Sequence, residues 1–268
     1  MSNIAIIIAN YNHGKYVVSS IQSALNQTYK NVKVYITNDG SKDDSLSRIV
    51  ENFNLVQTDS EYTYNQYYHG RYDVYKADRL TLIDIENSGA STARNLAIDL
   101  ALKEDRSLFA VCILDADDEC SPNKVSLMME KMLSSDDIGV VYADYIIERS
   151  GVFDRYLKVE YKKPYDREVL LAECIVHSGS LIKVEYLRKV QLNTGEFYDK
   201  KLHGPSSQGF IGCTEDYDLW LRLSNHCLMY HIPEPLTLVR EDGQNQSLKM
   251  TGEIFQKNME MINQRNAK

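Results

Sequence analysis

Along the N-terminal half of the chain, short apolar runs alternate with segments of helical periodicity. Continuous runs rich in isoleucine and valine predict buried strands, and apolar positions three or four residues apart predict helices. The predicted strands are 4–9, 32–37, 80–85, 109–114 and 138–144, and the predicted helices are 16–27, 41–53, 90–104 and 121–133. This order predicts an α/β fold with a mostly parallel central sheet and flanking helices. Beyond about residue 150 the alternation decays, which predicts a more irregular region.

The predicted strand 109–114 ends at three carboxylates, Asp115, Asp117 and Asp118. Ligands of open α/β sheets bind at the carboxyl ends of the strands. Carboxylates so close together repel one another unless a cation balances them, and oxygen ligands suit Mg²⁺ or Mn²⁺. The alternative is an acidic cluster that the dipole of a helix starting near Ser121-Pro122 favours by itself. We favour the metal site.

A second acidic pair, Glu215 and Asp216, precedes a helical pattern in which Leu219, Trp220 and Leu223 share one face. A carboxylate fixed at the start of a helix can accept a proton from a substrate hydroxyl. The same pair is also consistent with the ordinary negative charge of a helix N-terminus. Taken by itself, the pattern favours the helix N-terminus interpretation.

Three further motifs accompany these segments. They are Ala-Asn-Tyr-Asn at 9–12, Asn-Asp-Gly-Ser-Lys-Asp at 38–43, and Asn-Ser-Gly-Ala-Ser-Thr-Ala-Arg-Asn at 87–95. In this order, the five motifs resemble those of the inverting family 2 glycosyltransferases with the GT-A fold. The resemblance covers residues 4 to about 224, and the ordered set is far more specific than any single motif.

The resemblance implies a role for each matching residue. The expected donor is a UDP-sugar whose sugar is a hexose such as glucose. The donor is expected to bind together with Mn²⁺ or Mg²⁺. Residues expected at the donor are Ala9, Asn10, Tyr11 (stacking on the base), Asp39 (bonding a uracil-like ring), Arg94, Asn95, Asp115 (ribose and sugar), Asp117 (metal and diphosphate) and Arg240. Asp115 and Asp117 are the expected metal ligands. Asp216 is the expected general base, and Glu215 is expected to contact the acceptor.

One motif departs from the family pattern. Similar enzymes often carry an Arg-x-His element that contacts the diphosphate, whereas this chain has Arg240-Glu241-Asp242. Arg240 can still serve, but the sequence leaves open whether His231 or Asp242 replaces the usual histidine. The glycine-rich phosphate loops of nucleotidyltransferases and dehydrogenases are missing, so those classes are disfavoured. A catalytically inactive nucleotide-sugar-binding protein remains an alternative.

The composition narrows the setting. A formal charge of −8 argues against a protein that coats nucleic acid or anionic membranes by bulk electrostatics. Five scattered cysteines without a CxxC pair predict reduced thiols, and no apolar run approaches the roughly 20 residues of a membrane span. We therefore expect a cytoplasmic protein without a signal peptide. The expected organisation is a nucleotide-sugar half at 1–120, an acceptor and base half at 121–232, and a C-terminal extension at 233–268.

Two segments bear on the acceptor. Six tyrosines lie in 57–76, which predicts a surface hairpin or, alternatively, an aromatic platform for a sugar or base. The segment 151–205 carries ten Lys or Arg and eight Asp or Glu, with basic and aromatic residues interleaved at 155–158 and 161–165. This predicts a solvated surface or a surface that contacts phosphates. The resemblance implies a surface or capsular glycan precursor as the acceptor, and the alternative is DNA that bears hydroxymethylated or already glycosylated bases.

Overall fold

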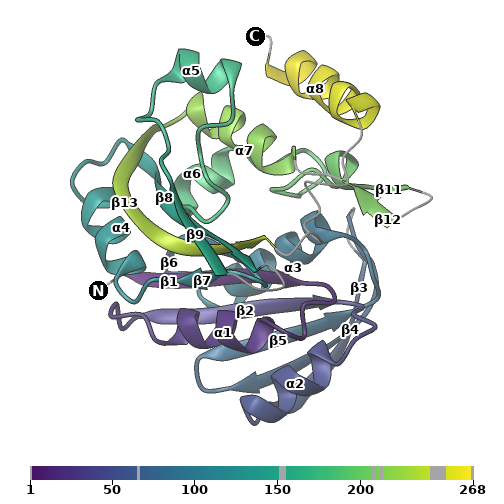
Figure 1. Cartoon of the computed structure of the whole chain (residues 1–268). Helices are drawn as coiled ribbons and strands as arrows, with labels where there is room; N and C mark the ends of the chain where they lie inside the picture. Colours follow the sequence, from purple (N-terminus) through teal and green to yellow (C-terminus); the bar gives the residue numbers. More distant parts are fainter. Residues whose placement is uncertain are drawn as a thin grey trace.

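A computed structural model describes residues 2–64, 67–150, 155–206, 209–211, 214–241 and 252–266. Within these residues, one large sheet crosses the molecule, with strands in the order β3-β4-β5-β2-β1-β6-β10-β8-β13-β7 and with β9 paired to β8 (Figure 1). The strands are β1 (Asn3–Asn10), β2 (Val32–Asp39), β3 (Val56–Tyr64), β4 (His69–Ala77), β5 (Leu80–Ile85), β6 (Leu108–Asp115), β7 (Glu119–Cys120), β8 (Ile138–Ser150), β9 (Arg155–Glu160), β10 (Leu181–Lys183) and β13 (Leu228–Glu241).

Helices cover both faces of this sheet. They are α1 (Val17–Leu25), α2 (Ser45–Asn52), α3 (Ala90–Glu104), α4 (Lys124–Met132), α5 (Arg167–Ala172), α6 (Val184–Lys189), α7 (Glu215–Ser224) and α8 (Gly252–Asn266). A short 3-10 turn, η1 (Lys200–His203), and a small hairpin of β11 (Gly204–Ser206) and β12 (Gly209–Ile211) complete the described elements.

The central strands are apolar on both faces because each face packs against a different layer of helices. In β1, Ile4, Ile6 and Ile8 pack with α1, α2 and α4, whereas Ala5 and Ile7 pack with α3, α6 and α7. Successive side chains of a strand point to opposite faces, so a strand between two layers needs a continuous apolar run. The predicted α/β class and the mostly parallel core of β5-β2-β1-β6 are confirmed.

The second half of the chain extends the sheet by less regular means. The three-residue strand β10 pairs antiparallel with both β6 and β8, and so joins the parallel core to the long parallel pair β8–β13. The sequence pattern did not predict β10, because three residues carry too little periodicity. The β13 strand continues in the sheet to Glu241. It therefore runs across residue 232, where the predicted acceptor half ends and the predicted C-terminal extension begins.

Two predicted helix starts are wrong. The helix predicted from residue 41 begins at Ser45, where the Asp43 carboxylate accepts bonds from the Ser45 backbone N–H at 3.0 Å and from its hydroxyl. Ser41 instead bonds to Asn38. The helix predicted from residue 121 begins at Lys124, because the Ser121 N–H donates to the Leu236 carbonyl of β13 at 3.0 Å and residues 122–123 form a turn.

The tyrosine-rich segment forms the antiparallel hairpin β3–β4, which pairs with β5 at one edge of the sheet. The predicted hairpin is confirmed, but Tyr67 and Tyr68 are buried rather than exposed. The Tyr67 hydroxyl donates a hydrogen bond to Asp99 on α3, and the Tyr68 hydroxyl donates to the Arg71 carbonyl at 2.8 Å. These two tyrosines thus dock the hairpin, and they do not form an open platform.

Two further observations concern the whole described chain. Cys112, Cys120, Cys174 and Cys227 are free thiols, whereas Cys213 lies outside the described residues. None of the described helices combines the length and apolar character needed to cross a membrane.

Candidate active site

The predicted donor residues meet at the carboxyl ends of β1, β2 and β6. The strand register pairs Ala9 with Asp115 on one side and Asn10 with Asn38 on the other, so the motif ends are direct neighbours. Parallel strands all end at the same sheet edge, and this edge is where open α/β sheets bind ligands. The first two motifs and the acidic cluster thus belong to one site.

A hydrogen-bond network ties the first two loops together. Asn10 donates to the Asn38 side chain at 2.9 Å, and Ser41 donates to the same oxygen at 2.6 Å. The backbone N–H of Asn12 donates to the Ser41 hydroxyl at 3.0 Å. Tyr11, the residue predicted to stack on the base, is half-buried within this braced loop.

Asp39 links the end of β2 to the start of α3. Its carboxylate accepts hydrogen bonds from the backbone N–H of Ser88 at 2.6 Å and of Gly89 at 2.9 Å. Gly40 has a φ of +63°, and a Cβ there would lie 2.5 Å from the backbone N of Asn87. The tight turn at Gly40 therefore allows the third motif to approach the second. Asp39 is buried, and both of its carboxylate oxygens accept hydrogen bonds from the backbone. Its contact with the base of the donor stays a prediction.

Arg94 is the centre of an ion-pair network. Its guanidinium lies 3.0 Å from Asp115 at the end of β6, 2.9 Å from Glu215 and 3.8 Å from Asp216 at the start of α7. Arg94 is only 7% exposed. Burial alone would lower the pKa of Arg94, but Asp216, Asp115 and Glu215 together raise it well above its usual value. Arg94 is therefore a permanent buried cation that joins both acidic motifs.

The same cation acts on Asp115. Burial favours the protonated carboxyl, but the charge and hydrogen bond of Arg94 outweigh it and lower the pKa of Asp115 below its usual range. The second oxygen of Asp115 accepts a hydrogen bond from the Ser178 hydroxyl at 3.3 Å. Asp115 is thus held ionised and oriented at neutral pH.

The rest of the acidic loop is braced by Arg240. Its backbone N–H donates to Asp118 at 3.1 Å, and its guanidinium donates to the Asp117 carbonyl at 2.7 Å and to the Glu119 carboxylate. Asp118 is buried, and burial together with Asp117 and Asp115 raises its pKa well above the usual range. Arg240 therefore contacts the acidic loop itself, and its contact with the donor stays a prediction.

A fully buried lysine lies beneath the loop. Lys124 donates to the Thr237 hydroxyl at 2.8 Å, and its charge lowers the pKa of Asp118 against the dominant effect of burial. The three neighbouring carboxylates of the acidic loop predict that a metal ion balances their charge. Arg94, Arg240 and Lys124 already supply positive charge to this loop, so charge balance is a weaker argument for the metal than the sequence suggested.

The residues nevertheless fit a divalent cation that is shared with a diphosphate. Among the described residues, no group of three His, Cys, Asp or Glu could hold a metal by itself. Mg²⁺ typically takes one or two carboxylates and completes its shell with water and substrate phosphates. Asp115 and Asp117 are both partly exposed and would provide those two ligands.

The two α7 carboxylates differ in exposure. The Glu215 side chain is 4% exposed, whereas that of Asp216 is 18% exposed. Asp216 is thus the more accessible of the two to an incoming hydroxyl. Thr214, just before the helix, accepts a hydrogen bond from Asn258 of α8 at 2.7 Å, which fixes the start of α7 from the C-terminal side.

Asn95 lies in the interior. It is 0% exposed, and its amide bonds to the backbone of Phe197 and Tyr198. The structure therefore separates it from Arg94, its neighbour in the motif, and gives it contacts with the protein chain.

Sequence analysis missed several residues around Asp115. Besides Ser178 and Lys124, they include His177, whose ring stacks on Tyr145 with 4.4 Å between centroids. Burial, followed by the charge of Lys124, lowers the pKa of His177 to about 3, so it is neutral at physiological pH. The only sequence signal was the Ser-Gly-Ser turn at 178–180, which has no helix or strand period.

His231 and Asp242 fare differently. His231 bonds to the buried Asp144 at 2.7 Å and stacks on Tyr142, so its contacts are those of an interior β13 residue. Asp242 lies outside the described residues. A cavity of ≈ 360 Å³ beside the acidic loop is lined by Arg240, Glu119, Glu148, Arg155, Lys15 and Tyr16, among others.

Three basic residues on and next to β9 are paired with carboxylates. Arg155 contacts Glu148, Lys163 contacts Glu173, and Lys158 lies 2.8 Å from Glu160. The exposed strand β9 therefore carries balanced charge, and these cations are less available to a phosphate backbone than the sequence suggested.

The candidate site thus lies at the edge of an α/β sheet, where a buried arginine joins an acidic loop to a carboxylate pair. The sequence matches the family described as Glycosyl transferase family 2 over residues 5–191, and the chain belongs to this family.

Similar proteins agree with this assignment. Chondroitin synthase of Escherichia coli is 27% identical over 248 residues, covering 92% of this chain and 30% of the relative. Hyaluronan synthase of Pasteurella multocida is 26% identical over 263 residues, covering 97% of this chain and 23% of the relative. The chain thus spans less than a third of the length of these two relatives.

Solved structures support the fold. Staphylococcus aureus TarS 1–349 in complex with UDP superposes with a TM-score of 0.65 at 14% identity, covering 97% of this chain and 64% of that chain. The mannosyltransferase PcManGT from Pyrobaculum calidifontis, in complex with GDP-Man and Mn²⁺, gives a TM-score of 0.56 at 16% identity, covering 92% and 58%. The predicted GT-A fold is confirmed by these neighbours.

Proposed function

We propose that this chain transfers a sugar from a UDP-sugar, with a hexose such as glucose as the sugar, to an acceptor hydroxyl with inversion at the anomeric carbon. The observation that carries the proposal is the Arg94 network. It holds Asp115 on β6 and Glu215 and Asp216 on α7 around one buried cation. A donor at the sheet edge and an acceptor at α7 would meet across this network.

In the proposed reaction, Asp216 accepts the proton of the acceptor hydroxyl. The hydroxyl oxygen bonds to the anomeric carbon as the bond to the diphosphate oxygen breaks, and the electron pair leaves with UDP. One displacement from the opposite face inverts the configuration, so no covalent sugar–enzyme intermediate is formed. Glu215, buried against Arg94, would orient the acceptor side of the site.

The donor would lie against the braced loops of β1 and β2. Ala9, Asn10 and Tyr11 would line the nucleotide, Tyr11 would stack on the base, and Asp39 would bond a uracil-like ring. Asp115 would face the ribose and sugar. Asp115 and Asp117 would hold Mn²⁺ or Mg²⁺, which as a Lewis acid would stabilise the charge on the departing diphosphate.

We favour a glycan as the acceptor. The names of two relatives, chondroitin synthase and hyaluronan synthase, indicate that these enzymes make glycans. The basic residues of β9 are paired with carboxylates, which makes DNA a less favoured acceptor. If DNA were the acceptor, binding would weaken steeply as salt rises, because counterions are released from each contacted phosphate. A filter-binding titration from 50 to about 200 mM salt tests this, and tight, strongly salt-dependent binding would favour DNA.

The decisive experiment is a thermal-shift screen of UDP-glucose, UDP-GlcNAc, GDP-mannose and UDP alone, each with and without Mn²⁺. A ligand that binds only the folded state raises the unfolding temperature in proportion to the logarithm of its concentration over Kd. We expect stabilisation by uracil nucleotides that increases with Mn²⁺. No shift with any nucleotide up to millimolar concentration would refute the proposal.

A further inference from the structure

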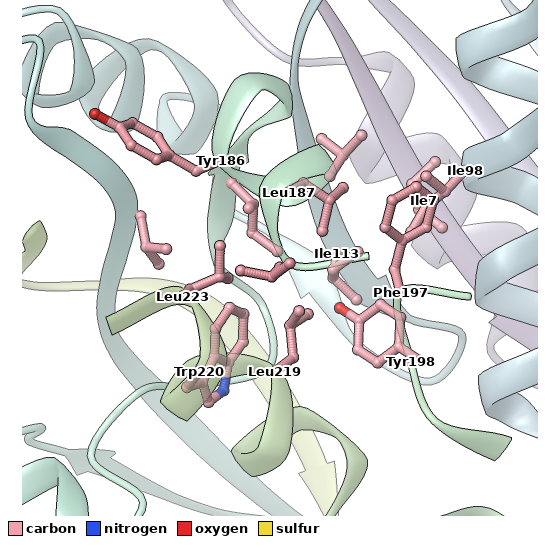
Figure 2. Packing of buried hydrophobic residues seen from close by; sticks show 14 of the residues in the cluster. Ile7, Ile98, Ile113, Tyr186, Leu187, Phe197, Tyr198, Leu219, Trp220 and Leu223 are labelled. Carbon is pink, nitrogen blue, oxygen red and sulfur yellow. The ribbon is translucent and has the colours of Figure 1, made fainter. Parts of the chain in front are cut away.

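The Arg94 guanidinium lies over the face of an aromatic ring. The Tyr198 ring lies with its centroid 5.4 Å from the guanidinium carbon, and the whole residue is 0% exposed. Figure 2 shows this ring among Phe197, Ile113 and Leu219, which belong to the same hydrophobic cluster. Within the described residues, the Tyr198 hydroxyl has no hydrogen-bond partner. The contact with Arg94 is therefore made by the ring and not by the polar end.

The backbone of this ring is held from the arginine's own helix. Asn95, the residue after Arg94 on α3, accepts hydrogen bonds from the N–H groups of Phe197 and Tyr198, each at 3.0 Å. Its amide nitrogen donates to the Tyr198 carbonyl at 2.8 Å. Three bonds from one buried side chain fix a segment that is a hundred residues distant in sequence. Helix α3 thus supplies both Arg94 and the Asn95 side chain that fixes the backbone of Tyr198.

The Arg94 side chain needs such support. It is long, and its guanidinium nitrogens reach carboxylates on two different elements, β6 and α7. Its Nε atom has no hydrogen-bond partner in the described part of the chain, so the stem of the side chain is not fixed by bonding. Packing of the guanidinium over an aromatic ring restricts movement of the fork without competing for its donors.

We propose that Asn95 and Tyr198 are positioning residues that hold Arg94 in its bridge between Asp115 and the carboxylates that open α7. The proposal rests on the proposed function, in which the donor lies at Asp115 and the base is Asp216. It assigns the asparagine of the third motif to the protein's own architecture and brings in a tyrosine that no motif contains. Loss of the ring would keep the charge and the hydrogen-bond donors of Arg94. The guanidinium would no longer be held in the position that bridges β6 and α7.

The experiment compares three variants of the full chain, using UDP release from UDP-glucose and UDP-GlcNAc with Mn²⁺ as the assay. Tyr198→Leu removes the ring, Tyr198→Phe keeps the ring, and Phe197→Leu is the matched control. Phe197 is 1% exposed, lies in the same cluster and bonds the same Asn95 oxygen, but Tyr198 is the residue that packs on Arg94. Unfolding temperatures are measured for all three variants. The rates of UDP release are then measured well below these temperatures.

We expect both leucine variants to lower the unfolding temperature by similar amounts. Tyr198→Leu should also lower kcat about tenfold or more with UDP affinity changed less than about threefold, because a mispositioned fork affects the reaction more than donor binding. Phe197→Leu should stay within about twofold of the native kcat, and Tyr198→Phe should recover most of the turnover that leucine loses. Equal kcat values for the two leucine variants would overturn the proposal. So would a loss in Tyr198→Phe as large as that in Tyr198→Leu, because the hydroxyl would then be the important group.

A crystal structure of Tyr198→Leu separates this proposal from the proposed function. We expect the Arg94 contact with Glu215 to lengthen or break, and an unchanged bridge would contradict the positioning role. This outcome does not depend on activity. If the native protein releases no UDP from any sugar nucleotide, the proposed function fails while the structural test of the Arg94 bridge still stands.

Discussion

The proposed donor side and the proposed base side of the candidate site are held in different ways. On the donor side, three neighbouring parallel strands end together, and hydrogen bonds among Asn10, Asn38 and Ser41 brace the loops that follow β1 and β2. On the base side, Glu215 and Asp216 reach the site through α7, and their link to the donor side is Arg94. Regular strand geometry is sufficient to assemble the first side. The second side depends on a few side chains from distant segments.

This difference predicts that changes on the base side affect turnover, and changes on the donor side affect binding or stability. Three substitutions test the contrast, from the largest expected effect to the smallest, and a fourth, with the smallest effect, tests a buried carboxyl outside both sides.

Asp216→Asn should reduce turnover by about 10³-fold, because an amide cannot accept the proton and a general base typically contributes 10²–10⁴-fold. UDP affinity with Mn²⁺ should change little, since Asp216 lies on α7 and not at the sheet edge. Steady-state UDP release and calorimetric binding measure both quantities. Glu260→Gln, an exposed change on α8, is the control. Near-normal turnover in Asp216→Asn would place the base elsewhere.

Asp117→Ala should weaken Mn²⁺-dependent UDP binding about 100-fold or more, because it removes one of the two proposed ligands of a shared cation. Metal-independent binding should change much less. Titrations of UDP with Mn²⁺ and with EDTA separate the two effects. If the affinity with Mn²⁺ were the same in the variant and the native protein, Asp117 would have no role in holding the cation.

Gly40→Ala should destabilise the fold by about 2 kcal/mol or more, since the residue has a left-handed φ and its Cβ would meet backbone atoms. Gly195→Ala is the matched control. Its φ is +88°, but nothing lies within 4 Å of a Cβ there, so only the backbone strain applies. Urea unfolding gives both values. Equal losses at the two positions would show that the contact with Asn87 does not matter.

Asp99→Asn should stabilise the fold by about 1 kcal/mol at pH 8 and by nothing at pH 4. Burial raises the pKa of Asp99 to about 6, and the hydrogen bond from Tyr67 opposes this only in part. The folded state therefore binds the proton more tightly than the unfolded state, so native stability falls as pH rises from about 4 to 6. Asparagine carries no charge and avoids this loss. Unfolding curves at several pH values would reveal a pH-independent difference if the inference is wrong.

The sequence was a good guide to the donor side. Apolar runs such as that of β1 mark strands buried on two faces, and the motifs at their ends were correctly placed at one sheet edge. Local details were less predictable. Ser41 has the chemistry of a helix cap, yet its hydroxyl donates to Asn38 at the end of β2 and accepts a hydrogen bond from the backbone N–H of Asn12, which lies 29 residues away in the loop after β1. Propensity rules consider only nearby residues, and so they miss such a competing contact.

The base side shows the limit more clearly. The pattern of α7 predicted one apolar face, but nine of its ten residues are buried because helices and sheet surround it. Tyr198, Ser178 and Lys124 carry no motif and no unusual spacing. Their importance follows from what they touch, namely Arg94, Asp115 and Thr237.

The amino-acid sequence by itself determined the α/β class, the order of the central elements and the identity of the acidic and arginine motifs, because periodicity and strand ends are local properties of the chain. Only the tertiary structure decided that Arg94 pairs with three carboxylates, that Asn95 faces inward and that protein cations balance the acidic loop. These contacts join residues about 20 to more than 100 positions apart. Their geometry depends on how the layers pack, and no window of sequence contains that information.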